Sequence, residues 1–415
     1  MMTAEERLER RQNTFVWPHL QRKEAVKNWP AADVLNTMAL NEFVPQMCRL
    51  PYDYLYRDDP VAMAETSLLV HEWLDIDSIA ASHDGYSFDV EAMGGKIRFF
   101  PNHSPDIDRT DQFVKSADDL EKVRFRGIDT GRYPYLIECY QAVERYVGLN
   151  LYPSTCGPWS LACNLYGGEN ILVAALTDPD FVHELLDRVI ADVLTPTVRA
   201  LKEALPSAKR VNFADAWATP PFLTADMYRE FIIPHYAKWA ELMAPDFTIG
   251  GCGVRMSGLK KEDQEFFWAE SIRARGSVQA NEPDLSVFGA EWFREEADSA
   301  NKSLSMLTSP SFIQLATPEE AAQRAKYLCL AGKKGKTPCT VGIGNSGGNP
   351  PLINLFTFIE ACKTYGAVDA NEDTPFEIPY NFQPFEEFLK GKLANNVEGY
   401  TFDWLSKSGY SHLKR

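Results

Sequence analysis

Short apolar runs alternate with longer amphipathic stretches along most of this chain. Beyond about residue 75, each run is followed by a turn and then by apolar residues at helical spacing. We expect strands at 78–82, 150–154, 211–214, 246–249, 276–280, 303–307 and 340–343. Strands that alternate with helices pair in parallel through crossover helices. The pattern therefore predicts an α/β fold, a (β/α)8 TIM barrel with one strand not recognised, with a doubly wound sheet as the alternative.

Capping signals mark three of the helices. Asp178 and Pro179 supply an N-cap and a first-turn proline ahead of an apolar stripe. Thr317 opens a capping box that is completed by a glutamate three residues later. A third helix begins near Thr224, and we expect Pro234 to bend it. These signals predict where three of the helices that alternate with the strands begin.

The first 75 residues are helical in character, so we expect an N-terminal helical extension over 1–75 and the barrel over 76–415. The chain has 42 Lys+Arg against 58 Asp+Glu, a net charge of −16. Such a surface repels phosphate backbones and anionic lipids, which argues against nucleic-acid and membrane partners. No apolar stretch approaches the length of a membrane span or a signal peptide, so we expect a cytoplasmic protein. Its eight cysteines form no CxxC pair and are expected to be reduced.

Ligands of parallel α/β folds meet the carboxyl ends of the strands. Polar and thiol side chains follow the predicted strands at these positions: His83, Asp84, Cys156, Asp215, Cys252, Asn281, Glu282, Ser309 and Asn345. The glycines of GIGNSGG at 342–348 follow a late strand without dinucleotide-binding spacing, and a tight turn is the better interpretation. The sequence therefore predicts a small-molecule site without a phosphate loop.

Four blocks of sequence resemble the uroporphyrinogen decarboxylase superfamily, which includes the decarboxylase and the corrinoid-dependent methyltransferases. They are SHDGYSFDVEAMGGKI at 82–97, GPWSLACNLYGGENI at 157–171, FADAWATPPFLTADMYREFIIPHY at 213–236 and VGIGNSGGNPPLINLFTFIEA at 341–361. They lie in a region from about 76 to 365, some 290 residues, in the order of the family. The resemblance implies a single (β/α)8 barrel.

The chain departs from the decarboxylase branch of that superfamily. An N-terminal arginine motif of the MRQAGR type is missing, and Asn164 stands where that branch has its active-site tyrosine. Gly342, Ile343 and Gly344 replace its Gly-His-Gly turn. A substrate with eight carboxylates needs cations to hold it, which a chain of net charge −16 supplies poorly. The resemblance thus favours another reaction.

The methyltransferase branch holds zinc with His-x-Cys-Gly and a later cysteine. Here Cys252 and Gly253 are kept, but Gly250 replaces the histidine, and Gly344 or Asn345 replaces the second cysteine. Cys252 is therefore either a metal ligand in a rearranged site or a packed thiol, and zinc stays an open question.

A relative that moves methyl groups to a corrinoid protein without activating a thiol would fit these departures. The resemblance then implies an O-demethylase component of anaerobic metabolism, which takes the methyl group of an aryl methyl ether (guaiacol, vanillate or veratrole type). Its partners would be a corrinoid carrier protein, whose cobalamin accepts the methyl group, and a small methyl donor. The alternatives are a lyase that decarboxylates another acid, a thiol-type zinc methyltransferase and a non-catalytic barrel that binds the corrinoid carrier.

Candidate residues follow from this hypothesis, each beside a plainer structural role. Asp84, His83 and Asp215 are the candidate proton donors to the departing oxygen, or caps of neighbouring turns. Side chains that would bind the substrate, or simply pack or face solvent, are Asn164, Trp159, Tyr166, Trp217, Asn281, Glu282 and Asn345.

Overall fold

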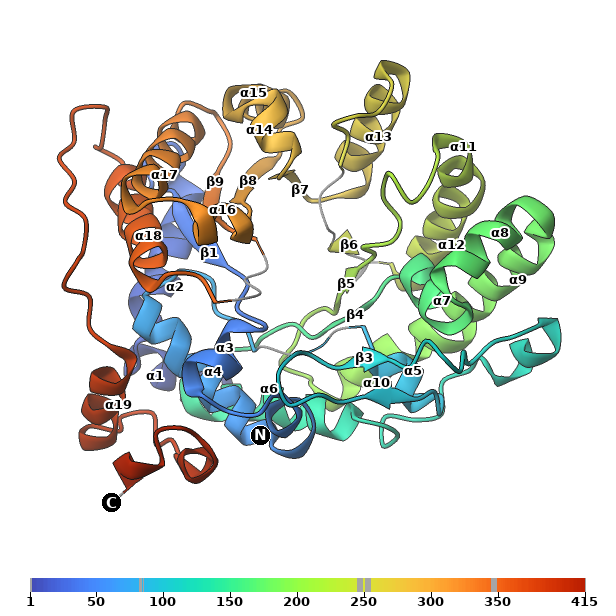
Figure 1. The fold of residues 1–415 in the computed structure, drawn as a ribbon, viewed down its shortest axis with the longest axis horizontal. Helices are drawn as coiled ribbons and strands as arrows, with labels where there is room; N and C mark the ends of the chain where they lie inside the picture. Colours follow the sequence, from blue (N-terminus) through green and yellow to red (C-terminus); the bar gives the residue numbers. More distant parts are fainter. Residues whose placement is uncertain are drawn as a thin grey trace.

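The structure is a computed structural model that describes residues 2–81, 84, 86–244, 249–250, 255–344 and 349–414. Two parallel sheets form its middle (Figure 1). The first has the order β1 (Leu35–Met38), β9 (Cys339–Ile343), β8 (Ser303–Thr308) and β7 (Ser277–Asn281). The second has the order β4 (Ser154–Cys156), β5 (Asn212–Ala214) and β6 (Ile249–Gly250). The chain is thus an α/β protein with parallel strands, as predicted.

Helices surround the strands on the outside (Figure 1). They are α1 (Ala4–Gln12), α2 (Val16–Ala25), α3 (Phe43–Cys48), α4 (Pro60–Leu74), α5 (Phe88–Ala92), α6 (Tyr133–Val147), α7 (Pro158–Tyr166), α8 (Gly168–Thr177), α9 (Pro179–Arg188), α10 (Thr195–Ala204), α11 (Ala225–Met227), α12 (Ile233–Met243), α13 (Lys261–Ala274), α14 (Asp284–Phe288), α15 (Ala290–Ser299), α16 (Pro310–Leu315), α17 (Pro318–Lys333), α18 (Leu352–Gly366) and α19 (Phe385–Ala394). None of the described helices is long and apolar enough to cross a bilayer.

The predicted helix signals act as expected. The side chain of Asp178 accepts a hydrogen bond from the N–H of Phe181, and Thr317 completes its capping box. The helix predicted from Thr224 is interrupted by a wider π-helical turn over Tyr228–Ile232, just before Pro234. A proline disrupts the helical ladder of the preceding turn, which accounts for this break.

Four predicted strands, β5, β7, β8 and β9, lie within a residue of their expected positions. The strand predicted at 150–154 is wrong in its start, because β4 begins only at Ser154. Pro153 has no N–H to donate to a ladder, and only its carbonyl is used, by the N–H of Asn212 at 2.8 Å. Of the strand predicted at 246–249, only Ile249 lies within the described residues.

The N-terminal region contributes a strand that its helical character did not predict. β1 pairs in parallel with β9, with Thr37 opposite Gly342. Residues 78–81, predicted as a strand, have no strand geometry, although the N–H of Asp77 donates to the carbonyl of Asn36 at 3.2 Å. The helical extension predicted over 1–75 therefore includes one strand of the sheet.

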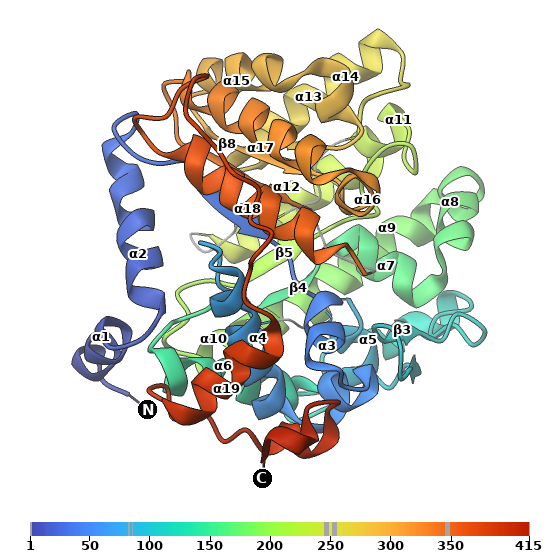
Figure 2. The ribbon, with the colours of Figure 1, turned by 60° about the vertical axis from the view of Figure 1, so that its left-hand side comes forward.

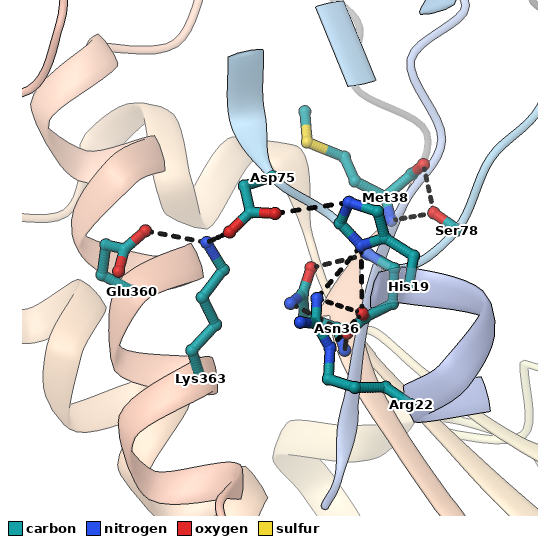
Figure 3. A network of polar contacts seen from close by, with 9 residues as sticks. His19, Arg22, Asn36, Met38, Asp75, Ser78, Glu360 and Lys363 are labelled. Atoms are coloured by element: carbon teal, nitrogen blue, oxygen red, sulfur yellow. Dashed lines mark hydrogen bonds and ion pairs between the residues drawn. The ribbon is translucent and has the colours of Figure 1, made fainter. Parts of the chain in front are cut away.

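A partly buried polar network connects α2 to the sheet and to α18 (Figure 3). The ring of His19 lies between the carboxylates of Asp75 and Asp77, at 3.3 Å from each. Burial raises the pKa of Asp77, but hydrogen bonds from His19 and the nearby charge of Arg22 outweigh it, and the pKa lies below its ordinary value. Lys363 of α18 pairs with Asp75 at 2.6 Å. This network places the N-terminal helices against the sheet.

The segment between α18 and α19, residues 367–384, packs on the helices without forming a helix or a strand. Figure 2 shows it leaving α18 and running back along the helices to α19. Its Phe382 stacks on Phe356 of α18, with ring centroids 4.5 Å apart. The segment therefore covers an apolar face of the helical layer.

The close pairing of β1 and β9 requires a glycine at position 342. A Cβ at Gly342 would lie 1.9 Å from the carbonyl oxygen of Thr37. We expect Gly342→Ala to lower the free energy of unfolding by at least about 2 kcal/mol, because the strands must separate to admit it. Gly391→Ala is the matched control, since nothing lies within 4 Å of its Cβ position. Urea unfolding followed by circular dichroism compares them; equal stability of the two variants would contradict the role of Gly342.

Candidate functional site

A cavity of about 320 Å³ opens beside the carboxyl ends of β4 and β5. Its size falls in the range that small-molecule sites occupy. Its wall combines aromatic, amide and charged side chains from distant parts of the sequence: Asn41, Glu42, Tyr56, Asp84, Tyr86, Ser87, Ser104, Pro105, Asp106, Ile107, Arg109, Asn164, Ala216 and Trp217. This position and lining make it the candidate active site.

Asp84 lies in the cavity wall and is held by three donors. The N–H of Tyr86 donates to its Oδ1 at 3.0 Å, and Ser87 Oγ and Arg132 donate to its Oδ2, the latter at 3.2 Å. Only 8% of its side chain is exposed. All three contacts are donated to Asp84, so they hold its carboxyl group in one orientation in the cavity wall. The proton-donor role of Asp84 stays a prediction.

Arg132, at the start of α6, joins several parts of the cavity wall from behind. Besides Asp84 it contacts Ser87, donates to the carboxylate of Glu91 at 2.5 Å and donates to the carbonyl of Tyr56 at 2.8 Å. Only 6% of its side chain is exposed. A buried guanidinium with this many acceptors is fixed in one orientation.

The same guanidinium lies over two aromatic rings. Its carbon is 4.5 Å from the ring centre of Phe88 and 4.8 Å from that of Phe99. Cation–π contacts of this kind are strengthened where water is excluded. They add to the hydrogen bonds that hold Arg132 behind the cavity.

Asp215 follows β5 and serves the first turn of α7. It accepts hydrogen bonds from the N–H groups of Trp159 and Ser160, at 3.1 and 2.7 Å, and from the hydroxyl of Tyr236 at 2.8 Å. Burial raises the pKa of Asp215 above its ordinary value, although these hydrogen bonds oppose the shift. Gly157 is needed here, because its Cβ would lie 2.4 Å from the Asp215 side chain. Asp215 therefore caps the start of α7 and binds Tyr236, and its side chain does not line the cavity.

Asn164 and Trp217, two of the predicted substrate-binding residues, line the cavity. Asn164 is buried on α7, and its amide nitrogen donates to the carbonyl of Tyr86 at 3.2 Å. Trp217 packs on Phe222, with ring centroids 5.1 Å apart, and a Cβ at Gly168 would touch its ring. The structure thus brings Asp84, Asn164 and Trp217 into one wall.

Two predicted substrate-binding aromatic residues pack elsewhere. Trp159 is 1% exposed and contacts Phe231 in the core, with ring centroids 6.0 Å apart. Tyr166 packs on Phe181 at 4.9 Å, on the outer side of α7. Neither lines the cavity. Their placement follows the packing alternative, because both face neighbouring helices.

Asn281 and Glu282 lie at the end of β7, away from this cavity. Glu282 forms an ion pair with Arg324 and accepts a hydrogen bond from the N–H of Ser286 at 3.1 Å. It borders a separate hollow of about 550 Å³ with Ser309 and Phe312. In the described part of the molecule, Asn281 and Glu282 therefore do not share a cavity with Asp84 and Asn164.

Three predicted site residues, His83, Cys252 and Asn345, lie outside the described residues. Among the residues that the structure does describe, no three His, Cys, Asp or Glu side chains lie together in a way that could hold a metal ion. The described residues therefore form no zinc site by themselves, and Cys252, the retained member of the zinc motif, lies outside them.

Sequence reasoning missed part of the cavity wall. Residues 104–109 belong to a strap formed by β2 (Ile97–Arg98) and β3 (Asp106–Ile107), and they bring Arg109 to the cavity. Tyr56 lies in the π-helical turn Tyr54–Asp58, and Arg132 directly precedes α6. No local signal marks these residues, because only the folded chain places them beside Asp84.

A buried carboxyl group lies close behind the wall. Asp89 on α5 is 1% exposed, and the hydroxyl of Tyr133 donates to its Oδ1 at 2.5 Å. Its Oδ2 has no hydrogen-bond partner among the described atoms. Burial raises the pKa of Asp89 to about 6, against the effect of Tyr133. Its charge therefore changes near neutral pH.

Comparison with known proteins identifies relatives over most of the chain. A family model described as "Uroporphyrinogen decarboxylase (URO-D)" matches residues 54–343. A methylated-thiol–coenzyme M methyltransferase of Methanosarcina mazei is 24% identical over 315 residues, which cover 74% of this chain and 77% of that protein. The methylcobamide:CoM methyltransferase MtbA of Methanosarcina acetivorans is 20% identical over 358 residues, covering 83% and 95% of the two chains.

A solved structure supports the same fold. A methyltransferase from Methanosarcina mazei superimposes with a TM-score of 0.61 at 18% sequence identity, over 83% of this chain and 98% of that one. Likeness at this level of identity concerns the fold.

Asp89 makes stability depend on pH in a defined direction. Since the pKa is raised from 3.8 to about 6 on folding, the folded protein retains a proton that the unfolded chain has lost between these values. The contribution of Asp89 therefore becomes less favourable as pH rises from 4 to 6. Between pH 4 and 6, we expect the free energy of unfolding of Asp89→Asn to rise by up to about 3 kcal/mol relative to that of the unmodified chain.

Chemical unfolding at pH 4, 5, 6 and 7 measures this difference. Asp111→Asn is a control of opposite sign, because hydrogen bonds from Lys115 and Lys96 lower the pKa of the exposed Asp111 to about 2. That variant should lose stability at neutral pH and regain it relative to the unmodified chain only as pH falls below 4. A pH-independent difference for Asp89→Asn would show that its carboxyl group does not titrate in this range.

Proposed function

The chain belongs to the uroporphyrinogen decarboxylase family, and we propose that it is a methyltransferase that moves a methyl group from a small donor to a corrinoid protein. The observation that carries the proposal is the cavity of about 320 Å³, walled by Trp217, Tyr86 and Asn164. It offers room for one substituted aromatic ring. Curated relatives named as methyltransferases support the same reaction class.

We propose an aryl methyl ether as the donor. Trp217 would stack on the ring, and the carbonyl oxygen of Asn164 would accept a hydrogen bond from a neighbouring hydroxyl, since its amide nitrogen already donates to Tyr86. Glu42, Asp84 and Asp106 line the same cavity, and such a wall repels a ligand with many carboxylates. The corrinoid of the partner protein is the second substrate and supplies the nucleophile.

The scaffold of this reaction is proposed to be one (β/α)8 barrel with N-terminal helices. The two sheets would be parts of it, and residues 76–81 would fill the place between β1 and β4. Two contacts favour this: Asp77 donates its N–H to Asn36, and the N–H of Met38 donates to Ser78 Oγ at 3.2 Å. Closure puts all the strand ends around one mouth, where the carrier protein would dock.

A thiol-type zinc methyltransferase is the second candidate. It is favoured by the name of one relative, a methylated-thiol–coenzyme M methyltransferase, and by the Cys252-Gly253 pair in the sequence. Metal analysis of the purified protein separates the two candidates. Stoichiometric zinc that is lost in Cys252→Ala would favour the thiol reaction.

Methyl transfer can be tested directly. Anaerobic incubation with cob(I)alamin and guaiacol is expected to release catechol and to methylate the corrinoid, followed by chromatography and absorbance. Asn164→Ala should raise KM for guaiacol roughly tenfold, because one hydrogen bond to the donor is lost. Asn170→Ala is the matched control, since Asn170 is exposed on α8 and does not line the cavity. Absence of transfer from every ether, methylamine and methyl thiol of a panel would contradict the proposal.

A further inference from the structure

Cleavage of an aryl methyl ether places negative charge on the departing oxygen. If the methyl carbon bonds to the nucleophile of the corrinoid protein, the electron pair of the broken C–O bond stays on that oxygen as phenolate. Of the two described carboxyl groups predicted to donate a proton, Asp215 does not line the cavity, and Asp84 pairs with Arg132 and accepts hydrogen bonds from Tyr86 and Ser87. The charge on the oxygen therefore needs another partner in the cavity.

Arg109 is the one cationic side chain among the described residues that line the cavity. It stands on the strap beside β3, in the same wall as Asn164 and Trp217. Among the described residues its hydrogen-bond and ion-pair partner is Asp106, at 3.1 Å, with 46% and 55% of the two side chains exposed. Exposed ion pairs of this kind contribute little to stability, so the guanidinium can exchange this partner for a ligand oxygen.

The two arginines at the cavity differ in how many guanidinium nitrogens already donate to protein acceptors. Arg132 uses all three of its guanidinium nitrogens on protein acceptors, including Asp84 and Glu91. Arg109 uses one nitrogen, on Asp106. Arg132 can therefore only position the wall, whereas Arg109 retains N–H groups for a ligand.

The positive charge of Arg109 affects the pKa of Cys163 on α7. Burial raises the pKa of Cys163 well above its ordinary value, and the positive charge of Arg109 is among the influences that oppose this shift. Cys163 directly precedes Asn164, which lines the cavity. Glu42, Asp84 and Asp106 are the negative groups that face the same space, and Arg132 already balances Asp84.

We propose that Arg109 is a catalytic residue that binds the departing phenolate oxygen and stabilises its charge. This inference rests on the proposed ether cleavage. The methyl carbon–oxygen bond breaks, a bond from that carbon to the nucleophile of the corrinoid protein forms, and the oxygen leaves as phenolate paired with Arg109. Solvent supplies its proton after release. No general acid is needed in this step.

The charge on Arg109 can be tested without the corrinoid protein. The probe is 4-nitrophenol, whose neutral and ionised forms absorb at different wavelengths. Bound to the full chain, it should ionise at lower pH than in buffer, because the guanidinium favours the phenolate. Arg109→Met should abolish this shift and weaken phenolate binding roughly tenfold, as expected for loss of one charge-assisted hydrogen bond. Asp106→Asn should enlarge the shift, because it removes the competing carboxylate.

Arg98→Met is the matched control, because Arg98 lies on the same strap over Phe100 and does not line the cavity. It should behave like the unmodified chain. The inference is overturned if 4-nitrophenol shows no shift on the unmodified chain, or if Arg109→Met retains it. Circular dichroism confirms that the exposed substitutions leave the fold intact.

Turnover gives the second readout. Arg109→Met should lower kcat for guaiacol roughly tenfold, and should lower it less for 4-nitroanisole, whose leaving group needs less stabilisation. An equal loss for both donors would overturn the catalytic role. Failure of the proposed function has a different signature: the unmodified chain transfers no methyl group from any ether, while the nitrophenol shift still depends on Arg109.

Discussion

Arg132 places a permanent positive charge behind the cavity, in a position from which water is largely excluded. Burying a guanidinium is costly unless acceptors surround it, and here Asp84, Glu91, Ser87 and the carbonyl of Tyr56 do so. Those acceptors come from α5, from the segment before it and from the region before α4. Because the buried guanidinium needs these hydrogen-bond acceptors, segments that are distant in the sequence lie together around it. The candidate site is a consequence of that constraint.

A second recurring feature is an aspartate after a strand whose carboxylate accepts hydrogen bonds from backbone N–H groups. Asp215, after β5, holds the N–H groups at the start of α7, which follows β4. Asp284, after β7, holds the N–H groups of Met256 and Ser257, at 2.6 and 2.7 Å, in the segment that follows β6. In each case a carboxylate from one strand end fastens the loop of the preceding strand. These bonds tie Met256, Ser257 and the first turn of α7 to the end of a neighbouring strand.

Much of the fold could be predicted because its signals are local. Helix caps such as Asp178 and Thr317, and the apolar runs of β7, β8 and β9, depend on residues a few positions apart. β1 was missed because four residues, Leu35–Met38, lie between helices and are stabilised by β9, some 300 positions later in the chain. The start of β4 was misplaced because Pro153 lies within an otherwise apolar run.

The sequence by itself determined the alternation of strands and helices, the resemblance to a family and the negative net charge of the chain. It also singled out Asp84 after a predicted strand, and Asn164 and Trp217 within the blocks that resemble the family. Only the tertiary structure decided which of these residues share a cavity, and that Asp84 and Asp215 already accept hydrogen bonds. It also brought in Arg132 and Arg109. The physical reason is that the role of a polar side chain depends on its partners, and these partners are supplied by segments that meet only in the folded chain.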